Sequence, residues 1–208
     1  LEKISGGNCD KDSLSEPIGY LSPSACFHVY ESYRNTVLDE KKTITLCQSV
    51  FRNEGKDRWG EFGRLKDYHV REVVFIGGET YIEESLQKMM EMTKELIKRL
   101  KLSGIIETAY DSFVIPKMQR YKLIQLHNKL KYEAKLKCSN GQMLSCASYN
   151  IHGKTFTYPF NISVKEIKNT VTGCVGFGLE RWVLCFISQY GYNMENWPED
   201  ITNFAKSW

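Results

Sequence analysis

Two strand-like segments, separated by a polar connection that contains glycines, constrain most strongly what this chain can fold into. Residues 43–52 (TITLCQSVFR) are rich in β-branched side chains, and residues 68–76 (YHVREVVFI) resume the pattern before stopping at Gly77 and Gly78. An antiparallel pair is the simplest arrangement of two long strands connected in this way. The chain is therefore predicted to build a sheet around this pair.

The remaining patterns predict one long helix, further strands and a second helix. Apolar side chains recur every three or four residues between positions 81 and 102, which indicates a helix. Residues 130–136 alternate strictly between apolar and charged side chains, as in a half-buried strand. We also expect strands at residues 27–33, 142–149 and 156–162, and a helix at residues 179–190 that is closed by Gly191. This order predicts an α+β fold with an antiparallel sheet flanked by helices, rather than a regular βαβ alternation.

Composition bounds the class of protein. The chain has 208 residues, of which 42% are hydrophobic and 12% aromatic, so we expect residues 1–208 to form one domain, with residues 1–20 as an irregular lead-in. The formal net charge of +3 falls short of the basic excess typical of extensive nucleic-acid binding. No apolar run is long enough to span a membrane, and no early segment resembles a secretory signal, so a cytoplasmic protein is expected.

The seven cysteines do not form a recognisable pattern. They include no CxxC pair, so a disulfide framework is not expected. Taken singly, each is best explained as an ordinary buried thiol. Cysteines so widely separated do not by themselves indicate a metal site.

A glycine-rich segment leads into the last predicted helix. Residues 173–181 (GCVGFGLER) would let a backbone lie close to a ligand, and they lack the Gly-Lys-Ser/Thr of a phosphate-binding Walker loop. Arg181 follows at the start of the helix, where its guanidinium can donate to a phosphate. The alternative is a surface salt bridge from Arg181 to a nearby acid.

The predicted strand pair places several polar side chains together. Arg52 and Glu54 lie two residues apart and share one face, as do Tyr68 and Glu72 on the returning strand. A phosphate donor, an acceptor, an aromatic ring and a carboxylate could thus line one concave surface. The alternative is an exposed sheet face that carries charges.

The order of these pieces resembles a known family. Residues 51–72 look like motif 2 of the class II aminoacyl-tRNA synthetases, and residues 176–181 look like motif 3. More closely, six blocks occur in the order seen in amino acid:carrier protein ligases, which are relatives of the catalytic core of methanogen-type seryl-tRNA synthetases. The blocks are LSPSACFHVYESY, FRNEG, RLKDYHVREVVFIGG, AYDSF, SYNIHGKTF and GCVGFGLERW. The resemblance covers residues 21–190 and implies a class II synthetase-like catalytic domain.

The resemblance implies a site for ATP. Arg52 would hold the α-phosphate and the substrate carboxylate, and Glu54 would bind the adenine amino group. Tyr68 would stack on adenine, where the family more often has Phe. Arg64 and Arg181 would hold the β- and γ-phosphates, with Arg52 and Arg181 stabilising charge during the reaction. Magnesium normally accompanies such a nucleotide.

The resemblance also implies a zinc ion bound by Cys26, Glu72 and Cys174. Three protein ligands leave a tetrahedral zinc with one open position, which the amino group of an amino acid can fill. The ion would then orient the amino acid for attack on ATP. Asn150 and His152 would line the amino-acid pocket, although His152 is equally explained as a structural hydrogen-bonding residue.

The implied activity has two steps. A small amino acid, such as glycine or alanine, would react with ATP to give an aminoacyl adenylate, which the phosphopantetheine thiol of an acyl or peptidyl carrier protein then attacks. The lysines of residues 129–137 could attract an acidic carrier protein, or they could form a solvated strand face. A homodimer is expected by analogy only, because motif 1 is not recognisable before Leu21.

Two other functions stay open. One is aminoacylation of tRNA, as in the atypical seryl-tRNA synthetases, although the small size and modest charge of the chain make tRNA an unexpected partner. The other is a non-catalytic relative that binds an amino acid or a partner without turnover. Retention of the implied ATP and zinc residues argues against it.

Overall fold

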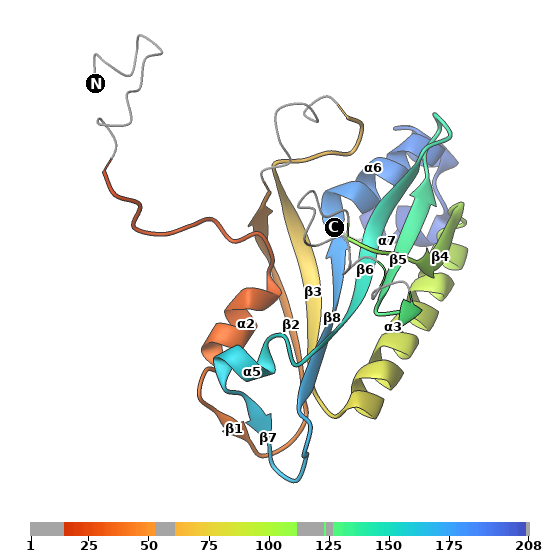
Figure 1. The fold of residues 1–208 in the computed structure, drawn as a ribbon. Helices are drawn as coiled ribbons and strands as arrows, with labels where there is room; N and C mark the ends of the chain where they lie inside the picture. Colours follow the sequence, from red (N-terminus) through yellow and green to blue (C-terminus); the bar gives the residue numbers. More distant parts are fainter. Residues whose placement is uncertain (1–14, 53–60, 112–122, 124–126, 207–208) are drawn as a thin grey trace.

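A six-stranded antiparallel sheet organises the molecule (Figure 1). The computed structural model describes residues 15–52, 61–111, 123 and 127–206, so the predicted adenine-binding residue Glu54 lies outside the described part. Along the sheet, the strands follow the order β2 (Lys42–Phe51), β3 (Asp67–Gly77), β8 (Val171–Gly178), β6 (Met143–Gly153), β5 (Lys131–Lys137) and β4 (Gly104–Thr108). Every neighbouring pair runs antiparallel, which confirms the predicted fold class.

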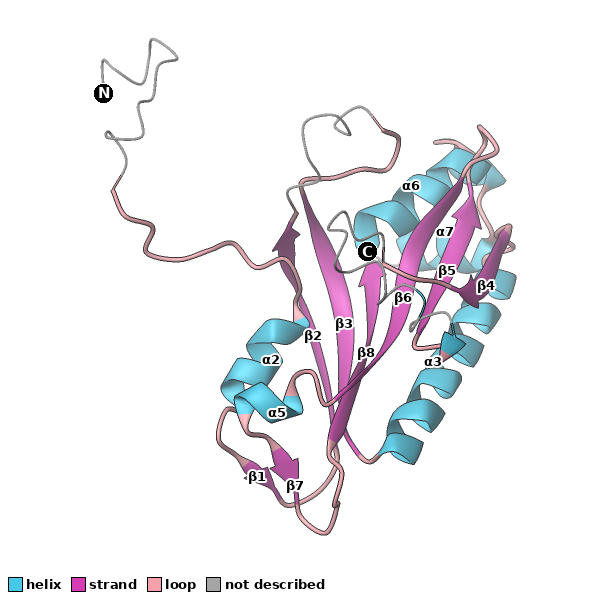
Figure 2. Ribbon diagram, viewed as in Figure 1, coloured by secondary structure: helices cyan, strands magenta, loops and turns pink. Residues whose placement is uncertain are grey.

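Two helices cover one face of this sheet (Figure 2). Helix α3 (Glu79–Arg99) packs Ile82 and Leu86 against Tyr149 and Val175 of the sheet. Helix α6 (Leu179–Tyr190) buries Cys185 in a second cluster, at the other end of the same face. The 3-10 helix η4 (Met194–Asn196) and helix α7 (Glu199–Lys206) follow α6. Apolar burial on this face fixes the register that orients the opposite face.

A small layer covers one end of the opposite face (Figures 1 and 2). It consists of helix α2 (Cys26–Ser32), helix α5 (Thr157–Phe160) and a two-stranded parallel sheet of β1 (Val37–Leu38) and β7 (Ser163–Val164). Val29 and Tyr30 of α2 pack against Val74 and Ile76 of β3. The rest of this sheet face borders a cleft.

Two predicted strands are helices instead. Residues 27–33 form most of α2, because the buried positions Cys26, Val29 and Tyr30 recur with helical spacing on the face that meets the sheet. The segment 156–162 forms α5 and a turn, in which Asn161 adopts a left-handed φ of 52°. Aromatic and β-branched side chains favoured strands at both places, and packing onto the sheet overrides that preference.

Strand β5 alternates as expected, but its charged face borders the cleft instead of open solvent. Ala134 and Leu136 are completely buried under the helices. The side chain of Lys131 is only 10% exposed and pairs with Asp111. Lys135 pairs with Glu107 at 2.8 Å. Carboxylates therefore neutralise Lys131 and Lys135, whereas Lys129 and Lys137 are exposed.

Within the described residues, no helix combines the length and the apolar character needed to cross a membrane.

Candidate active site

The cleft lies over the part of the sheet that α2 and α5 leave uncovered. Strands β3, β8 and β6 form its floor, and the segment before α2 borders it. The lining residues include most of those predicted to act on ATP, the metal and the amino acid, namely Cys26, Arg52, Arg64, Tyr68, Glu72, Asn150, His152, Cys174 and Arg181. Residues that are far apart in the sequence therefore share one cavity.

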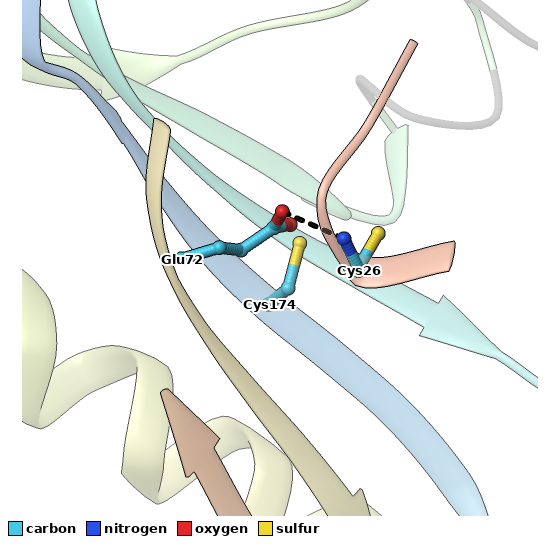
Figure 3. A group of neighbouring side chains, drawn as sticks. All are labelled: Cys26, Glu72 and Cys174. Atoms are coloured by element: carbon cyan, nitrogen blue, oxygen red, sulfur yellow. Dashed lines mark hydrogen bonds between the residues drawn. The ribbon is translucent and has the colours of Figure 1, made fainter. Parts of the chain in front are cut away.

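Cys26, Glu72 and Cys174 meet at the floor of this cleft (Figure 3). Their ligand atoms all lie within 4.8 Å of one another, and all three residues are buried. Glu72 of β3 is opposite Gly176 of β8, and Cys174 is two residues further along β8, so both side chains point to the same face. Cys26 begins α2, and its backbone N–H donates to Glu72 Oε2 at 2.9 Å.

The electrostatics of this group favour a cation. Burial raises the pKa of the Glu72 carboxyl group. The hydrogen bond with Cys26, burial and the negative charge of Glu72 together raise the pKa of the Cys174 thiol well above its usual value. These acids can ionise together only if a positive charge joins them. Two thiolates and a carboxylate at this spacing fit zinc, with a fourth tetrahedral position left for a ligand.

Asn150 and His152, predicted to line the amino-acid pocket, contact Cys174. Asn150 Nδ2 lies 3.7 Å from Cys174 Sγ, and His152 Nε2 lies 3.6 Å from the same sulfur. Burial lowers the pKa of His152 to about 4, so the imidazole is neutral at physiological pH. Both residues border the cleft, and both touch the predicted metal ligand directly.

The guanidinium groups of two arginines lie over the aromatic ring of Tyr68. The guanidinium carbons of Arg52 and Arg181 are 5.5 and 5.9 Å from the centre of the ring. Arg181 Nε donates a hydrogen bond to the carbonyl oxygen of Gly63, and Arg181 Nη1 donates one to that of Ser145, each at 3.0 Å. Within the described chain, these hydrogen-bond partners are carbonyls rather than the carboxylate of a surface salt bridge. A flat aromatic surface flanked by two guanidinium groups suits a nucleotide.

The remaining predicted phosphate ligand, Arg64, lies at the cleft edge. Its Nε forms an ion pair with Glu61 Oε2 at 2.9 Å, and its side chain is 31% exposed. It thus borders the same cavity as Arg181.

Several cleft residues were not predicted to contribute. Asp111, Lys131 and Glu133 form a connected ionic group on the wall beyond Asn150, which is directly opposite Lys131 in the register of β6 and β5. The sequence feature that indicates such a polar wall is an interior strand with charges of both signs on one face. Tyr30 and Thr172 also matter, because both contact His152 Nδ1.

Comparison with known proteins identifies the family. A family model described as the tRNA synthetase class II core domain (G, H, P, S and T) matches residues 12–190. The type-2 serine–tRNA ligase of Methanopyrus kandleri is 30% identical over 203 residues, which cover 92% of this chain and 38% of the relative. That of Methanocaldococcus jannaschii is 28% identical over 204 residues, which cover 94% and 39%. The chain thus spans less than half the length of these relatives.

Solved structures agree with this likeness. The M. kandleri seryl-tRNA synthetase in its complex with A. aeolicus tRNASec superimposes with a TM-score of 0.83 at 26% identity, over 99% of this chain and 42% of that one. The Pyrococcus horikoshii seryl-tRNA synthetase complexed with ATP shares the fold, with a TM-score of 0.67 at 15% identity. The match covers 91% of this chain and 43% of that one. This chain therefore belongs to the family of class II tRNA synthetase core domains and is homologous to the catalytic core of methanogen-type seryl-tRNA synthetases.

Proposed function

We propose that this chain activates an amino acid with ATP, forming an aminoacyl adenylate and releasing pyrophosphate. One observation carries the proposal: the buried group of Cys26, Glu72 and Cys174 shares a cleft with Tyr68 and its flanking arginines. One part of the cleft suits a cation that can bind an amine, and the other suits a nucleotide. Condensing an amino acid with ATP needs both parts side by side.

The residues of the cleft divide the work. Zinc, when bound by Cys26, Glu72 and Cys174, supplies a Lewis-acidic position for the α-amino group. Tyr68 offers its ring to the adenine. Arg52 would hold the substrate carboxylate beside the α-phosphate while a carboxylate oxygen bonds to the α-phosphorus and the bond to pyrophosphate breaks.

The second arginine acts on the leaving group. Arg181 stands at the N-terminus of α6, where the helix dipole adds to its charge, and it would bind the departing phosphates with Arg64. Magnesium is the usual companion of such a triphosphate. Glu54, the predicted adenine ligand, stays a prediction because it lies outside the described residues.

The comparisons correct our expectation about the acceptor of the activated amino acid. Binding of tRNA was not expected, yet the relatives are serine–tRNA ligases, and one solved neighbour is a complex with tRNA. The net charge of +3 belongs to a chain that matches only 38% of the length of such a relative. This charge is therefore a poor guide to tRNA binding. We therefore propose the 3′ end of a tRNA as the acceptor and serine as the first amino acid to test.

Transfer to a carrier-protein thiol, with glycine or alanine as substrate, remains the prediction from the sequence blocks. The names of the relatives do not support it. A non-catalytic relative is the third alternative, and the joint presence of Arg52, Arg181 and the three predicted metal ligands in one cleft argues against it.

Amino-acid-dependent exchange between ATP and pyrophosphate tests the first step. Zinc-replete protein is assayed with each amino acid in turn, and we expect exchange above background with serine or another small amino acid. If no amino acid supports exchange, the adenylation proposal fails. The acceptor is then tested with the active amino acid, by acid-precipitable charging of tRNA in parallel with mass spectrometry of phosphopantetheinylated carrier protein. Labelled carrier protein with uncharged tRNA would overturn the tRNA proposal and leave adenylation intact.

A further inference from the structure

Two side-chain nitrogen atoms of strand β6 lie next to the sulfur of Cys174. Asn150 Nδ2 is 3.7 Å from Cys174 Sγ, and His152 Nε2 is 3.6 Å from it, distances at which sulfur accepts hydrogen bonds. Asn150 is directly opposite Cys174 in the register of β6 and β8, whereas His152 lies at an irregularity in this pairing, between Ile151 and Gly153. The contact of Asn150 therefore follows from the pairing of the strands, and the local irregularity of β6 lets His152 reach the same sulfur.

The partners of His152 define the direction of its hydrogen bonds. Its Nδ1 lies 3.2 Å from the Tyr30 hydroxyl group and 3.3 Å from Thr172 Oγ1. A metal-bound thiolate carries no proton and can only accept, so Nε2 must hold the imidazole proton that faces Cys174. Nδ1 then accepts a hydrogen bond from a hydroxyl group. The contacts form one consistent chain, from Tyr30 through His152 to Cys174.

Aromatic packing holds the imidazole ring in place. Phe156 meets it edge to face, with ring centres 4.9 Å apart and an angle of 85° between the rings. Tyr30 stacks on Phe156 with ring centres 4.2 Å apart, lies edge to face with His152 at 6.2 Å, and is completely buried. Helices α2 and α5 thus fix the orientation of His152 against the sheet.

The charge of the metal centre explains why these donors are needed. Two thiolates and a carboxylate around a divalent zinc leave one net negative charge in a buried place. Each ligand has a nearby group that can donate a hydrogen bond. Glu72 accepts from the backbone N–H of Cys26 at 2.9 Å, and Cys26 Sγ lies 3.2 Å from Ser24 Oγ. Cys174 Sγ has the side-chain nitrogens of Asn150 and His152 beside it.

We propose that His152 is a positioning residue for the metal centre. Oriented by Tyr30, His152 donates a hydrogen bond from Nε2 to the thiolate of Cys174. This inference rests on the proposed zinc-dependent function and gives His152 a role other than contact with the amino acid. The hydrogen bond withdraws electron density from the sulfur, which stabilises the thiolate and makes the bound ion a stronger acceptor for an amine.

Metal binding by the intact chain tests the proposal without relying on activity. In His152→Phe, the ring packing persists and the N–H is lost, whereas His152→Gln retains an N–H donor. His69→Gln on the opposite, exposed side of β3 is the matched control. Zinc affinity is measured by competition with a chromophoric chelator, and the thiolate-to-metal charge-transfer band is recorded with cobalt(II) in place of zinc.

We expect His152→Phe to bind zinc about 10- to 100-fold more weakly. Its cobalt band should move to longer wavelength, because an electron-richer sulfur is more easily oxidised. His152→Gln should restore most of the zinc affinity and most of the band position. His69→Gln should match the wild type in both. If His152→Phe fails to fold by circular dichroism, Tyr30→Phe carries the test, with a smaller band shift in the same direction.

The outcomes separate two failures. Wild-type protein that takes up neither zinc nor cobalt at one ion per chain overturns the metal centre itself. Wild-type protein that binds one ion, alongside folded His152→Phe or Tyr30→Phe with an unchanged band and affinity, overturns only the role of His152.

Discussion

Glu72 and Cys174 illustrate how single residues acquire their chemistry in this fold. Each side chain points into the cleft because of its parity along a strand, and each is buried because α2 covers that end of the sheet. The same parity brings Asn150 beside Cys174. An even-numbered residue of β3 therefore faces either the cleft or the α2 layer, and its neighbours in sequence lie on the opposite face of the sheet.

Removal of the Cys174 thiol should eliminate the metal centre. In Cys174→Ala, only Cys26 and Glu72 remain as ligands, so we expect zinc content after dialysis to fall from about one ion per chain to a small fraction. Exchange between ATP and pyrophosphate should fall with it. Atomic spectroscopy and the exchange assay on the same preparations measure both. The exposed Cys47→Ala is the control, and full activity in a zinc-free Cys174→Ala protein contradicts the site.

Replacement of Arg181 should act on the nucleotide and not on the metal. We expect Arg181→Ala to weaken ATP binding by about 10- to 100-fold, because a charge-assisted hydrogen bond contributes about 1.5–3 kcal/mol. Zinc content should stay near one ion per chain. Calorimetric titration with ATP measures the affinity, and Arg99→Ala, which removes only an exposed ion pair with Asp200, should bind ATP normally. Unchanged ATP affinity in Arg181→Ala is the contrary result.

For single residues, the sequence indicates which side chains belong to the site, but it does not predict which atoms they contact. The resemblance named Cys26, Glu72 and Cys174, and the structure brings these three together. It also named Asn150 and His152, but strand parity cannot say which atom of the cleft a side chain reaches. One of the two hydroxyl groups beside His152, that of Tyr30, comes from a helix that was predicted as a strand, so its approach could not be foreseen.

At the scale of elements, patterns long enough to show their period were predicted correctly. Helices α3 and α6 and strands β2, β3 and β5 each span several repeats of an apolar pattern. The short helices α2 and α5 have only one or two turns, and their aromatic residues favour strands locally. Contacts with the sheet decide their conformation, and such contacts are not visible in a local window.

Glu180 connects two elements, and its effect should depend on pH. Its carboxylate accepts hydrogen bonds from the backbone and the ring of His69, tying α6 to β3. Burial raises the pKa of Glu180, but these hydrogen bonds outweigh it and hold the pKa below its usual 4.5. The resulting stabilisation is fully present above pH 4.5 and is lost as the pH falls through the lowered value.

We therefore expect Glu180→Gln to lower the free energy of unfolding by about 1 kcal/mol at pH 7. The difference from the wild type should shrink below pH 4.5. Urea denaturation at several pH values measures it. A difference that is constant from pH 7 to pH 3 would show that the charge of Glu180 does not contribute.

Two glycines of β8 should respond differently to an added methyl group. A Cβ at Gly173 would lie 2.5 Å from Ile82 of α3 and 3.0 Å from a backbone oxygen, so Gly173→Ala should cost about 1–3 kcal/mol of stability. At Gly176, the nearest atom would be 3.4 Å away, and that side of the strand borders the cleft. Gly176→Ala should unfold close to the wild type. Thermal denaturation compares the two, and equal stability losses would contradict this difference.

At the scale of the whole molecule, the predicted metal ligands join separate parts of the chain. Cys26 belongs to the layer of α2 and α5, whereas Glu72 and Cys174 belong to the central sheet. An ion bound to all three residues couples that layer to the sheet. Binding to the folded state alone stabilises it by mass action.

Removal of the ion should therefore lower thermal stability. With free zinc at 100 times its dissociation constant, the stabilisation is about 2.7 kcal/mol. For a chain of this size, that corresponds to a fall in Tm of about 5 to 10 °C after chelation. Scanning calorimetry before and after chelation, with zinc added back, measures it. Cys174→Ala should show no such change, and an equal shift in that variant would place the stabilising ion elsewhere.

The diagonal placement of Glu72 and Cys174 across β3 and β8 has a consequence for folding. A slip of one residue between these strands would turn one of the two side chains toward the helices, so a misaligned sheet cannot assemble the site. A change in loop length leaves both side chains on the same face. A single-residue insertion within either strand turns one of them away from the site. In a refolding experiment, the moment at which the chain captures an ion therefore marks the moment at which its two central strands are correctly aligned.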